Sequence, residues 1–108
     1  MEAFRKLADV VGFSNEKMRK NGVFETKRTS CDVYCFEPGQ AQAVHAHDGS
    51  DKIYFVLEGT GTFRIGDTEK QLGKNEFAIA ESGVRHGVEN QTDARLEVLV
   101  FVAPRPHH

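Results

Sequence analysis

Between Gly22 and the C-terminus the sequence consists of short β-rich runs, and each run is ended by residues that favour turns. The turn segments include Glu-Pro-Gly at 37–39, Gly66-Asp67, Gly73-Lys74-Asn75 and Asn90-Gln91-Thr92-Asp93. Runs of this length and spacing are typical of a β-sandwich or a β-barrel. We therefore predict an all-β fold.

The first 21 residues follow a different pattern, with apolar residues at helical spacing. These residues are Ala3, Phe4, Leu7, Ala8 and Val11. A chain of 108 residues is long enough for one hydrophobic core but not for two. We predict an N-terminal arm at 1–21 with a short turn capped by Ser14, a barrel at 22–104 and a C-terminal tail at 105–108. The tail ends in His107 and His108, which are either native or the remains of an expression tag, and we assign them no role.

The charge and hydropathy of the chain argue against several classes of partner. Charged residues make up 28% of the sequence but the net charge is only -2, so no basic surface is expected for nucleic acid. No apolar run is long enough to cross a membrane, and the N-terminus lacks the apolar core of a secretory signal. We expect a cytoplasmic protein that binds small molecules or a second copy of itself, with neither nucleic acid nor a membrane as partner.

The two cysteines, Cys31 and Cys35, lie four residues apart in a run that is predicted to form a strand. An extended strand separates their Cα atoms by roughly 13 Å, which is too far for a disulfide between them. Both side chains would project from the same face as Val33, so we expect them to be small core residues.

Three of the five histidines occupy positions that suit a metal site. His45 and His47 are two residues apart on a predicted strand, so their side chains share one face. His86 follows about forty residues later, after Ser-Gly-Val-Arg. Imidazoles that point the same way can serve as ligands of one metal ion.

These histidines lie in segments that resemble the two sequence motifs of the cupin superfamily. The first segment has Gly39, His45, His47 and a closing Gly59, and the second has Gly83, His86 and Asn90, all at the spacing of the motifs. The resemblance covers residues 22–104. It implies a double-stranded β-helix, which is a jelly-roll barrel, with His45, His47 and His86 in its interior as ligands of zinc, iron, manganese or nickel.

The chain departs from the cupin pattern where cupins have a metal-binding Glu, seven residues before the closing glycine. Counting back from Gly59 reaches Lys52, and strand alternation places Lys52 and Tyr54 on the inward face. Asp51 could become a fourth ligand if a bulge at the start of the strand turned it inward, and Asp48 is an alternative from the preceding loop. In the second motif, Asn75 replaces the usual opening glycine, a mild change because Asn tolerates positive φ.

A cationic Lys52 beside a divalent metal would be repelled, so its ammonium must bend away, lose its proton or pair with an anion. Pairing with a carboxylate or phosphate of a ligand would make Lys52 a substrate-binding residue. The alternative is that Lys52 reaches the barrel mouth or pairs with Asp48 or Asp51. Tyr54 and Asn90 are further candidates for substrate binding; Tyr54 could instead be a wall residue, and Asn90 could instead form a turn.

Two functional hypotheses follow from the resemblance. The first is a metal-dependent enzyme that acts on a small organic substrate, with a reaction of the dioxygenase or isomerase type. The second is a non-catalytic protein that binds or senses a sugar or an organic acid, since a fold does not determine a function. The outward run Ile53, Phe55 and Leu57 is too apolar for water, so we predict a homodimer through this face, or else its coverage by the N-terminal arm.

Overall fold

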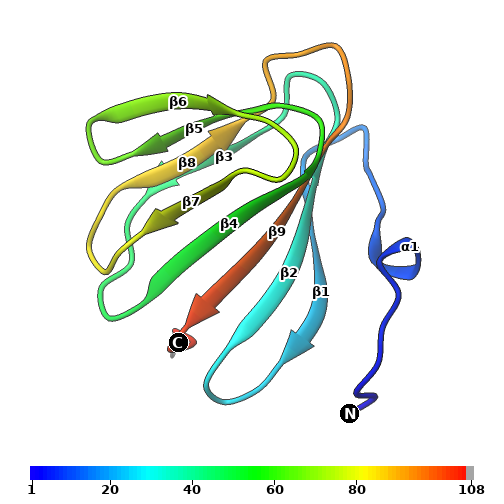
Figure 1. Ribbon diagram of the computed structural model, residues 1–108, viewed down its shortest axis with the longest axis vertical. Helices are drawn as coiled ribbons and strands as arrows, with labels where there is room; N and C mark the ends of the chain where they lie inside the picture. The colour runs from blue at the N-terminus through cyan, green and yellow to red at the C-terminus, as the bar shows by residue number, and fades with distance from the viewer. Residues whose placement is uncertain (107–108) are drawn as a thin grey trace.

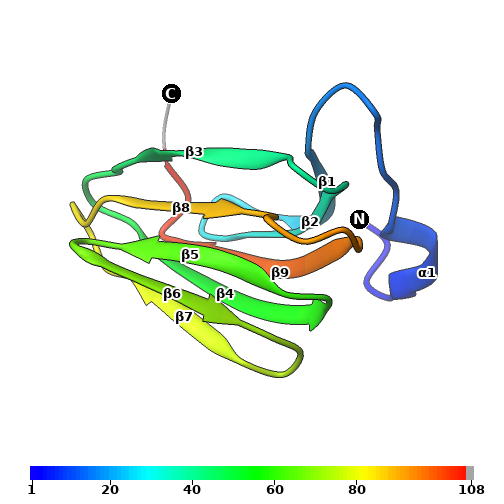
Figure 2. The ribbon, with the colours of Figure 1, turned by 90° about the horizontal axis from the view of Figure 1, so that it is seen from above.

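The computed structural model describes residues 1–106, and its strands form two antiparallel sheets that pack face to face (Figure 1). Within these residues the larger sheet has the strand order β1-β2-β9-β4-β7 and the smaller sheet the order β3-β8-β5-β6. The strands are β1 (Arg19–Glu25), β2 (Ser30–Phe36), β3 (Ala41–His45), β4 (Asp51–Glu58), β5 (Gly61–Ile65), β6 (Thr68–Leu72), β7 (Phe77–Ala80), β8 (His86–Glu89) and β9 (Leu96–Ala103). In Figure 2 the strands β1 and β3 lie at the same edge of the sandwich. The predicted all-β jelly-roll fold is confirmed.

The core lies between the two sheets and follows from the alternation of side chains along each strand. On β4, Lys52, Tyr54 and Val56 are buried in the interior, while the residues between them face outward and are at least partly exposed. Strand β9 lies between β2 and β4, which explains why its segment is so apolar. The other core residues are Tyr34, Phe36, Phe63, Leu72, Val88, Leu96, Val98 and Val100.

The N-terminal arm packs on the outer face of the larger sheet. Its helix α1 (Leu7–Val10) lies beside β1 in Figure 1 and is shorter than the spacing predicts. Ser14 caps no helix; its hydroxyl accepts a hydrogen bond from the backbone N–H of Glu16 at 3.2 Å and forms a local turn. The first strand begins at Arg19, inside the segment predicted to be the arm. No helix in residues 1–106 is long and apolar enough to span a membrane.

The arm covers only part of the outer face. The covered part is built around Val10, Val33 and Cys35, with Val11, Phe13, Val23, Leu57 and Leu99 packed against them. Both cysteines are free and buried, as predicted. The uncovered part, which we call the β4–β7–β9 face, consists of Ile53, Phe55, Phe77, Ile79 and Phe101. Phe77 is 68% exposed, and its ring centre lies 4.4 Å from that of Phe55. Of the outward apolar run predicted from the sequence, the N-terminal arm therefore covers Leu57 but leaves Ile53 exposed.

Two of the turns with positive φ lie at positions that the cupin motifs single out. Gly59, between β4 and β5, has a φ of 85°, and a Cβ at this position would collide with the carbonyl oxygen of Arg95. Asn75, between β6 and β7, has a φ of 71°, which agrees with its place in the motif. The backbone N–H of Asn75 donates to the carbonyl of Val56 at 2.8 Å, so this turn is tied to β4.

Candidate metal centre

The pairing of β3 with β8 brings the three histidines together. His45 ends β3 and lies opposite His86, the first residue of β8, and His47 follows in the next loop. The ring centres of His45 and His86 are 4.3 Å apart, and that of His47 lies 4.7 Å from His45 and 5.9 Å from His86. One ring nitrogen of each residue lies within 4.8 Å of those of the other two. This distance allows all three nitrogens to contact one ion.

Two of the imidazoles are held in the tautomer that a metal ligand needs. His45 Nδ1 lies 2.8 Å from the carbonyl oxygen of Ala43, and His86 Nδ1 lies 2.9 Å from that of Val84. Because a carbonyl can only accept, each Nδ1 must carry a proton, so in the neutral ring the lone pair lies on Nε2. Such a hydrogen bond from the second nitrogen is a regular feature of metal-binding histidines.

His86 Nε2 is a buried polar atom without a hydrogen-bond partner in the described part of the chain. Burial is the main cause that lowers the pKa of His86, and the nearby Lys52 lowers it further, so the ring is held neutral. An unsatisfied buried acceptor costs about 1–3 kcal/mol. A metal ion bound at Nε2 would remove this cost, so the residues present fit a divalent transition metal.

Lys52 lies in the interior with 4% of its surface exposed. Its Nζ is 5.0 Å from the ring centre of Tyr34 and 5.3 Å from that of Tyr54. No carboxylate of residues 1–106 forms an ion pair with it. Burial, followed by the charge of Lys20, lowers the pKa of Lys52 to about 7. The alternative that Lys52 reaches the barrel mouth or pairs with Asp48 or Asp51 is therefore wrong, because its ammonium is inside the barrel against two aromatic rings.

Tyr54 forms part of the wall beside the histidines. Its side chain is fully buried, and its ring centre lies 6.3 Å from that of His86. The Tyr54 hydroxyl donates to Gln42 Oε1 at 3.1 Å, and Gln42 Nε2 donates to the Tyr34 hydroxyl at 3.4 Å. Burial raises the pKa of Tyr54 and raises that of Tyr34 to about 12, so both phenols stay protonated at neutral pH.

Comparison with known proteins identifies the family of this chain: residues 32–102 match the Cupin domain family. The chain belongs to the cupins. Its sequence is 29% identical over 65 residues to the oxalate-binding protein of Thermotoga maritima, covering 60% of this chain and 54% of that protein. It is 32% identical over 72 residues to the tetracenomycin polyketide synthase protein TcmJ of Streptomyces glaucescens, covering 64% of this chain and 48% of that protein. The chain thus spans about half the length of these two relatives.

Solved structures resemble this cupin over its whole length. The crystal structure of TT1209 from Thermus thermophilus superimposes with a TM-score of 0.92 and 42% sequence identity, and it covers 95% of this chain and 98% of that one. A protein with a double-stranded β-helix domain from Klebsiella pneumoniae superimposes with a TM-score of 0.89 and 26% identity, covering 96% and 91% of the two chains.

The two aspartates considered as a fourth ligand are not part of the histidine group of this cupin. Asp51 is exposed, and its Oδ1 accepts a hydrogen bond from the backbone N–H of Ser82 at 3.0 Å. The irregularity in the pairing of β4 with β9 falls between Val56 and Glu58, so no bulge turns Asp51 inward. Asp48 is exposed in the loop. Within residues 1–106 the group that could hold a metal contains three histidines and no carboxylate.

Asn90 uses its whole side chain within a turn. Its Nδ2 donates to the carbonyls of Ala94 at 2.8 Å and Phe36 at 3.4 Å, and its Oδ1 accepts from the N–H and the hydroxyl of Thr92. The residue is fully buried, so no polar atom is left for a ligand. Asn90 therefore forms a turn, as in the second of its two predicted roles, and we do not include it in the site proposed below.

Sequence reasoning misses Gln42, which faces the interior with 7% of its surface exposed. Regular alternation would place Gln42 on the face opposite to His45. The pairing of β3 with β8 shifts between these two residues, and the bulge brings both side chains inward. The sequence Ala-Gln-Ala-Val-His contains no glycine or proline that would signal such a bulge.

Proposed function

We propose that this cupin holds a divalent transition metal on His45, His47 and His86 and binds a small organic acid beside it. The observation that carries the proposal is the buried, unpartnered Nε2 of His86, which lies in a group of nitrogens within 4.8 Å of one another. Imidazole ligands suit zinc, iron and nickel. A metal on three ligands would supply a Lewis acid with open coordination positions.

Lys52 is the proposed anchor for the acid. A buried ammonium without a counter-ion is costly, and a carboxylate of the ligand would supply the missing partner. The rings of Tyr34 and Tyr54 hold the lysine on the inner side of the barrel, and Tyr54 is also the ring next to His86. An organic acid is also the ligand that the name of the Thermotoga maritima relative states.

A catalytic role is the second candidate. Three ligands from one end of the barrel leave positions for a substrate or for oxygen, which is the arrangement of catalytic zinc and mononuclear iron sites. The Streptomyces relative belongs to a polyketide synthase. Turnover of an organic acid by the iron-loaded protein, with oxygen consumption, would favour a dioxygenase, and rearrangement without oxygen would favour an isomerase.

We also propose that two copies associate through the β4–β7–β9 face. Its five large apolar side chains include four that are at least 39% exposed. Contiguous exposed apolar surface of this kind is usually covered by a partner. A two-fold symmetric dimer buries the same face on both copies.

Elemental analysis of the purified protein tests the metal site. The protein should be produced without a purification tag and compared with the variant His45→Ala/His86→Ala. We expect about one transition metal ion per chain in the wild type and a loss of most of it in the variant. Asp51→Asn is the matched control: the Asp51 carboxylate accepts a hydrogen bond from the backbone N–H of Ser82, and we expect the metal content of this variant to be unchanged. Equal metal content in the wild type and the double variant would exclude the site.

A further inference from the structure

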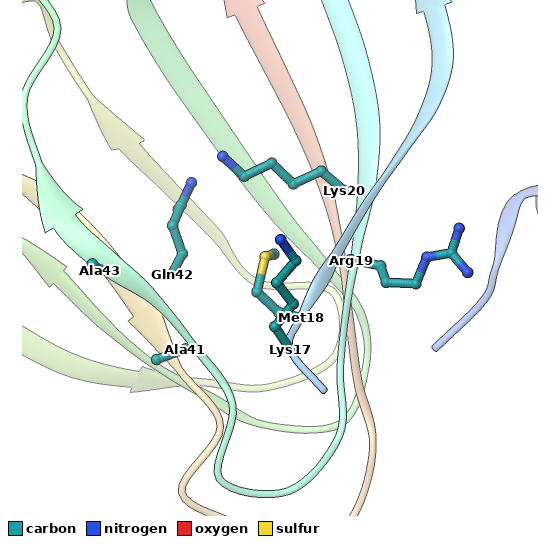
Figure 3. Close-up of a pocket in the computed structure, with 7 residues that line it drawn as sticks. All are labelled: Lys17, Met18, Arg19, Lys20, Ala41, Gln42 and Ala43. Atoms are coloured by element: carbon teal, nitrogen blue, oxygen red, sulfur yellow. The ribbon is translucent and has the colours of Figure 1, made fainter. Parts of the chain in front are cut away.

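A cavity of about 520 Å³ opens at the edge of the sandwich between β1 and β3 (Figure 3). These are edge strands of different sheets and do not pair with each other. The cavity is lined by Lys17, Met18, Arg19, Lys20, Ala41, Gln42 and Ala43. In Figure 3, Lys20 extends into the space between β1 and β3 toward Gln42, whereas its neighbour Arg19 points away.

Lys20 brings a second cation close to Lys52. The Nζ of Lys20 lies 5.4 Å from the ring centre of Tyr34, and the Nζ of Lys52 lies 5.0 Å from the centre of the same ring. Neither ammonium forms an ion pair within residues 1–106. The two lysines differ in position, since Lys20 lines the open cavity and Lys52 is buried in the interior.

The carboxylate of Asp32 interacts electrostatically with both lysines. It lies on β2, on the same side as Tyr34, and interacts with both Lys20 and Lys52 over more than ion-pair distance. A divalent metal on three neutral imidazoles adds two further positive charges. The two lysines and the metal would then carry more positive charge than Asp32 balances, so an anionic ligand would stabilise this region in the form that keeps Lys52 protonated.

We propose that the acid bound by this cupin is a dianion with two separated carboxylates, one held at the histidines and Lys52 and the other held by Lys20 at the β1–β3 opening. The first contact rests on the proposed function, and the second is independent of it. Gln42 lies between the two carboxylate positions, because it lines the cavity and also hydrogen-bonds Tyr34 and Tyr54. A dicarboxylate has one anionic group for each cationic place, whereas orthophosphate concentrates its charge at one point.

The test is isothermal titration calorimetry at pH 7 on the full chain loaded with zinc. Succinate and glutarate are compared with butyrate, which matches succinate in carbon number but has one carboxylate, and with inorganic phosphate. We expect the better dicarboxylate to bind about tenfold or more tightly than butyrate. Lys20→Met should remove this advantage without weakening butyrate, because loss of the Lys20 charge favours the protonated form of Lys52 that holds the first carboxylate. Arg19→Met is the matched control, since Arg19 is the adjacent cation that points away, and it should alter neither affinity.

The outcomes separate this inference from the proposed function. If butyrate binds the zinc-loaded protein but the dicarboxylates bind no more tightly, or keep their advantage in Lys20→Met, the dianion proposal is wrong and the metal site stands. If phosphate binds as tightly as the dicarboxylates and also depends on Lys20, the ligand class is wrong. If no carboxylate binds the zinc-loaded wild type better than His45→Ala/His86→Ala, both proposals fail. The preference of the wild type is measured without any variant, so a folding defect cannot hide the result.

Discussion

Replacing Lys52 with Met should stabilise the metal-free protein at acidic and neutral pH. Met retains the length of the side chain and its packing against Tyr34 and Tyr54 but removes the charge. The pKa of Lys52 is lowered from 10.5 to about 7, and each unit corresponds to about 1.4 kcal/mol. Burying the charged form of Lys52 therefore lowers the free energy of unfolding of the wild type by at most about 5 kcal/mol. Lys52→Met regains this amount but loses the contacts of the ammonium with the two rings, which are worth about 1–2 kcal/mol.

The pH dependence has a definite sign. Between pH 7 and pH 10.5 the unfolded chain keeps the Lys52 proton and the folded chain has lost it. Because the unfolded state binds more protons in this window, the free energy of unfolding of the wild type rises with pH there. The variant Lys52→Met lacks this contribution. Its advantage over the wild type should be largest at pH 6 and should disappear by about pH 10.

Urea unfolding followed by circular dichroism at pH 6, 8 and 10 measures the difference. The protein should be stripped of metal first, because bound metal would stabilise the folded state separately. Lys70→Met, an exposed lysine on β6, is the control, and its stability should stay within about 0.5 kcal/mol of the wild type at each pH. If Lys52→Met is no more stable than the wild type at pH 6, or if the gap does not narrow as pH rises, Lys52 is not an unpaired buried cation.

Three further predictions concern the fold and the assembly. Gly59→Ala should lower the free energy of unfolding by about 3 kcal/mol or more in urea unfolding, since its methyl group would collide with the backbone. The control is Gly39→Ala: this position also has a positive φ, of 83°, but has open space around it, so the variant should lose only about 1 kcal/mol. Asn90→Ala should cost about 2–4 kcal/mol by the same assay and leave the metal content unchanged; a loss of metal would contradict its role as a turn residue. Phe77→Lys should convert a dimer into a monomer in size-exclusion chromatography with light scattering, and a monomeric wild type would refute the proposed interface.

The parts of the site that can be predicted from the sequence lie on strands with regular alternation. On β4, the inward positions of Lys52 and Tyr54 follow directly from a period of two, and the burial pattern of that strand agrees. The histidines can be grouped because two segments with matching motif spacing converge in a jelly roll. Gln42 cannot be assigned to the interior, because a bulge reverses the faces of β3 between it and His45.

The position of Lys20 at the β1–β3 opening could not be predicted from the sequence for a related reason. Arg19, Lys20 and Asn21 form a polar stretch before the first apolar run, so the pattern places their segment in the arm. In the structure they pair with β2, with Lys20 opposite Tyr34. A charged residue on the inner face of an edge strand is indistinguishable from a loop residue by periodicity alone. Only the pairing partner shows that Lys20 shares the inner face of the sheet with Tyr34, where it lines the open cavity.

The exchange of a Glu for a lysine at position 52 changes the electrostatics of the whole interior. A carboxylate there would have offset half the charge of a divalent metal, whereas the ammonium adds to it. Since residues 1–106 place no anion within ion-pair distance of Lys52, the proposed ligand would take over part of the charge balance from the protein. Under the proposed function, the metal and the Lys52 ammonium repel each other and an anion bound beside both relieves that repulsion. Metal and anion should therefore bind cooperatively, and this coupling must be reciprocal. The substitution therefore points to a cupin whose metal site is completed by its acidic ligand rather than by a fourth protein side chain.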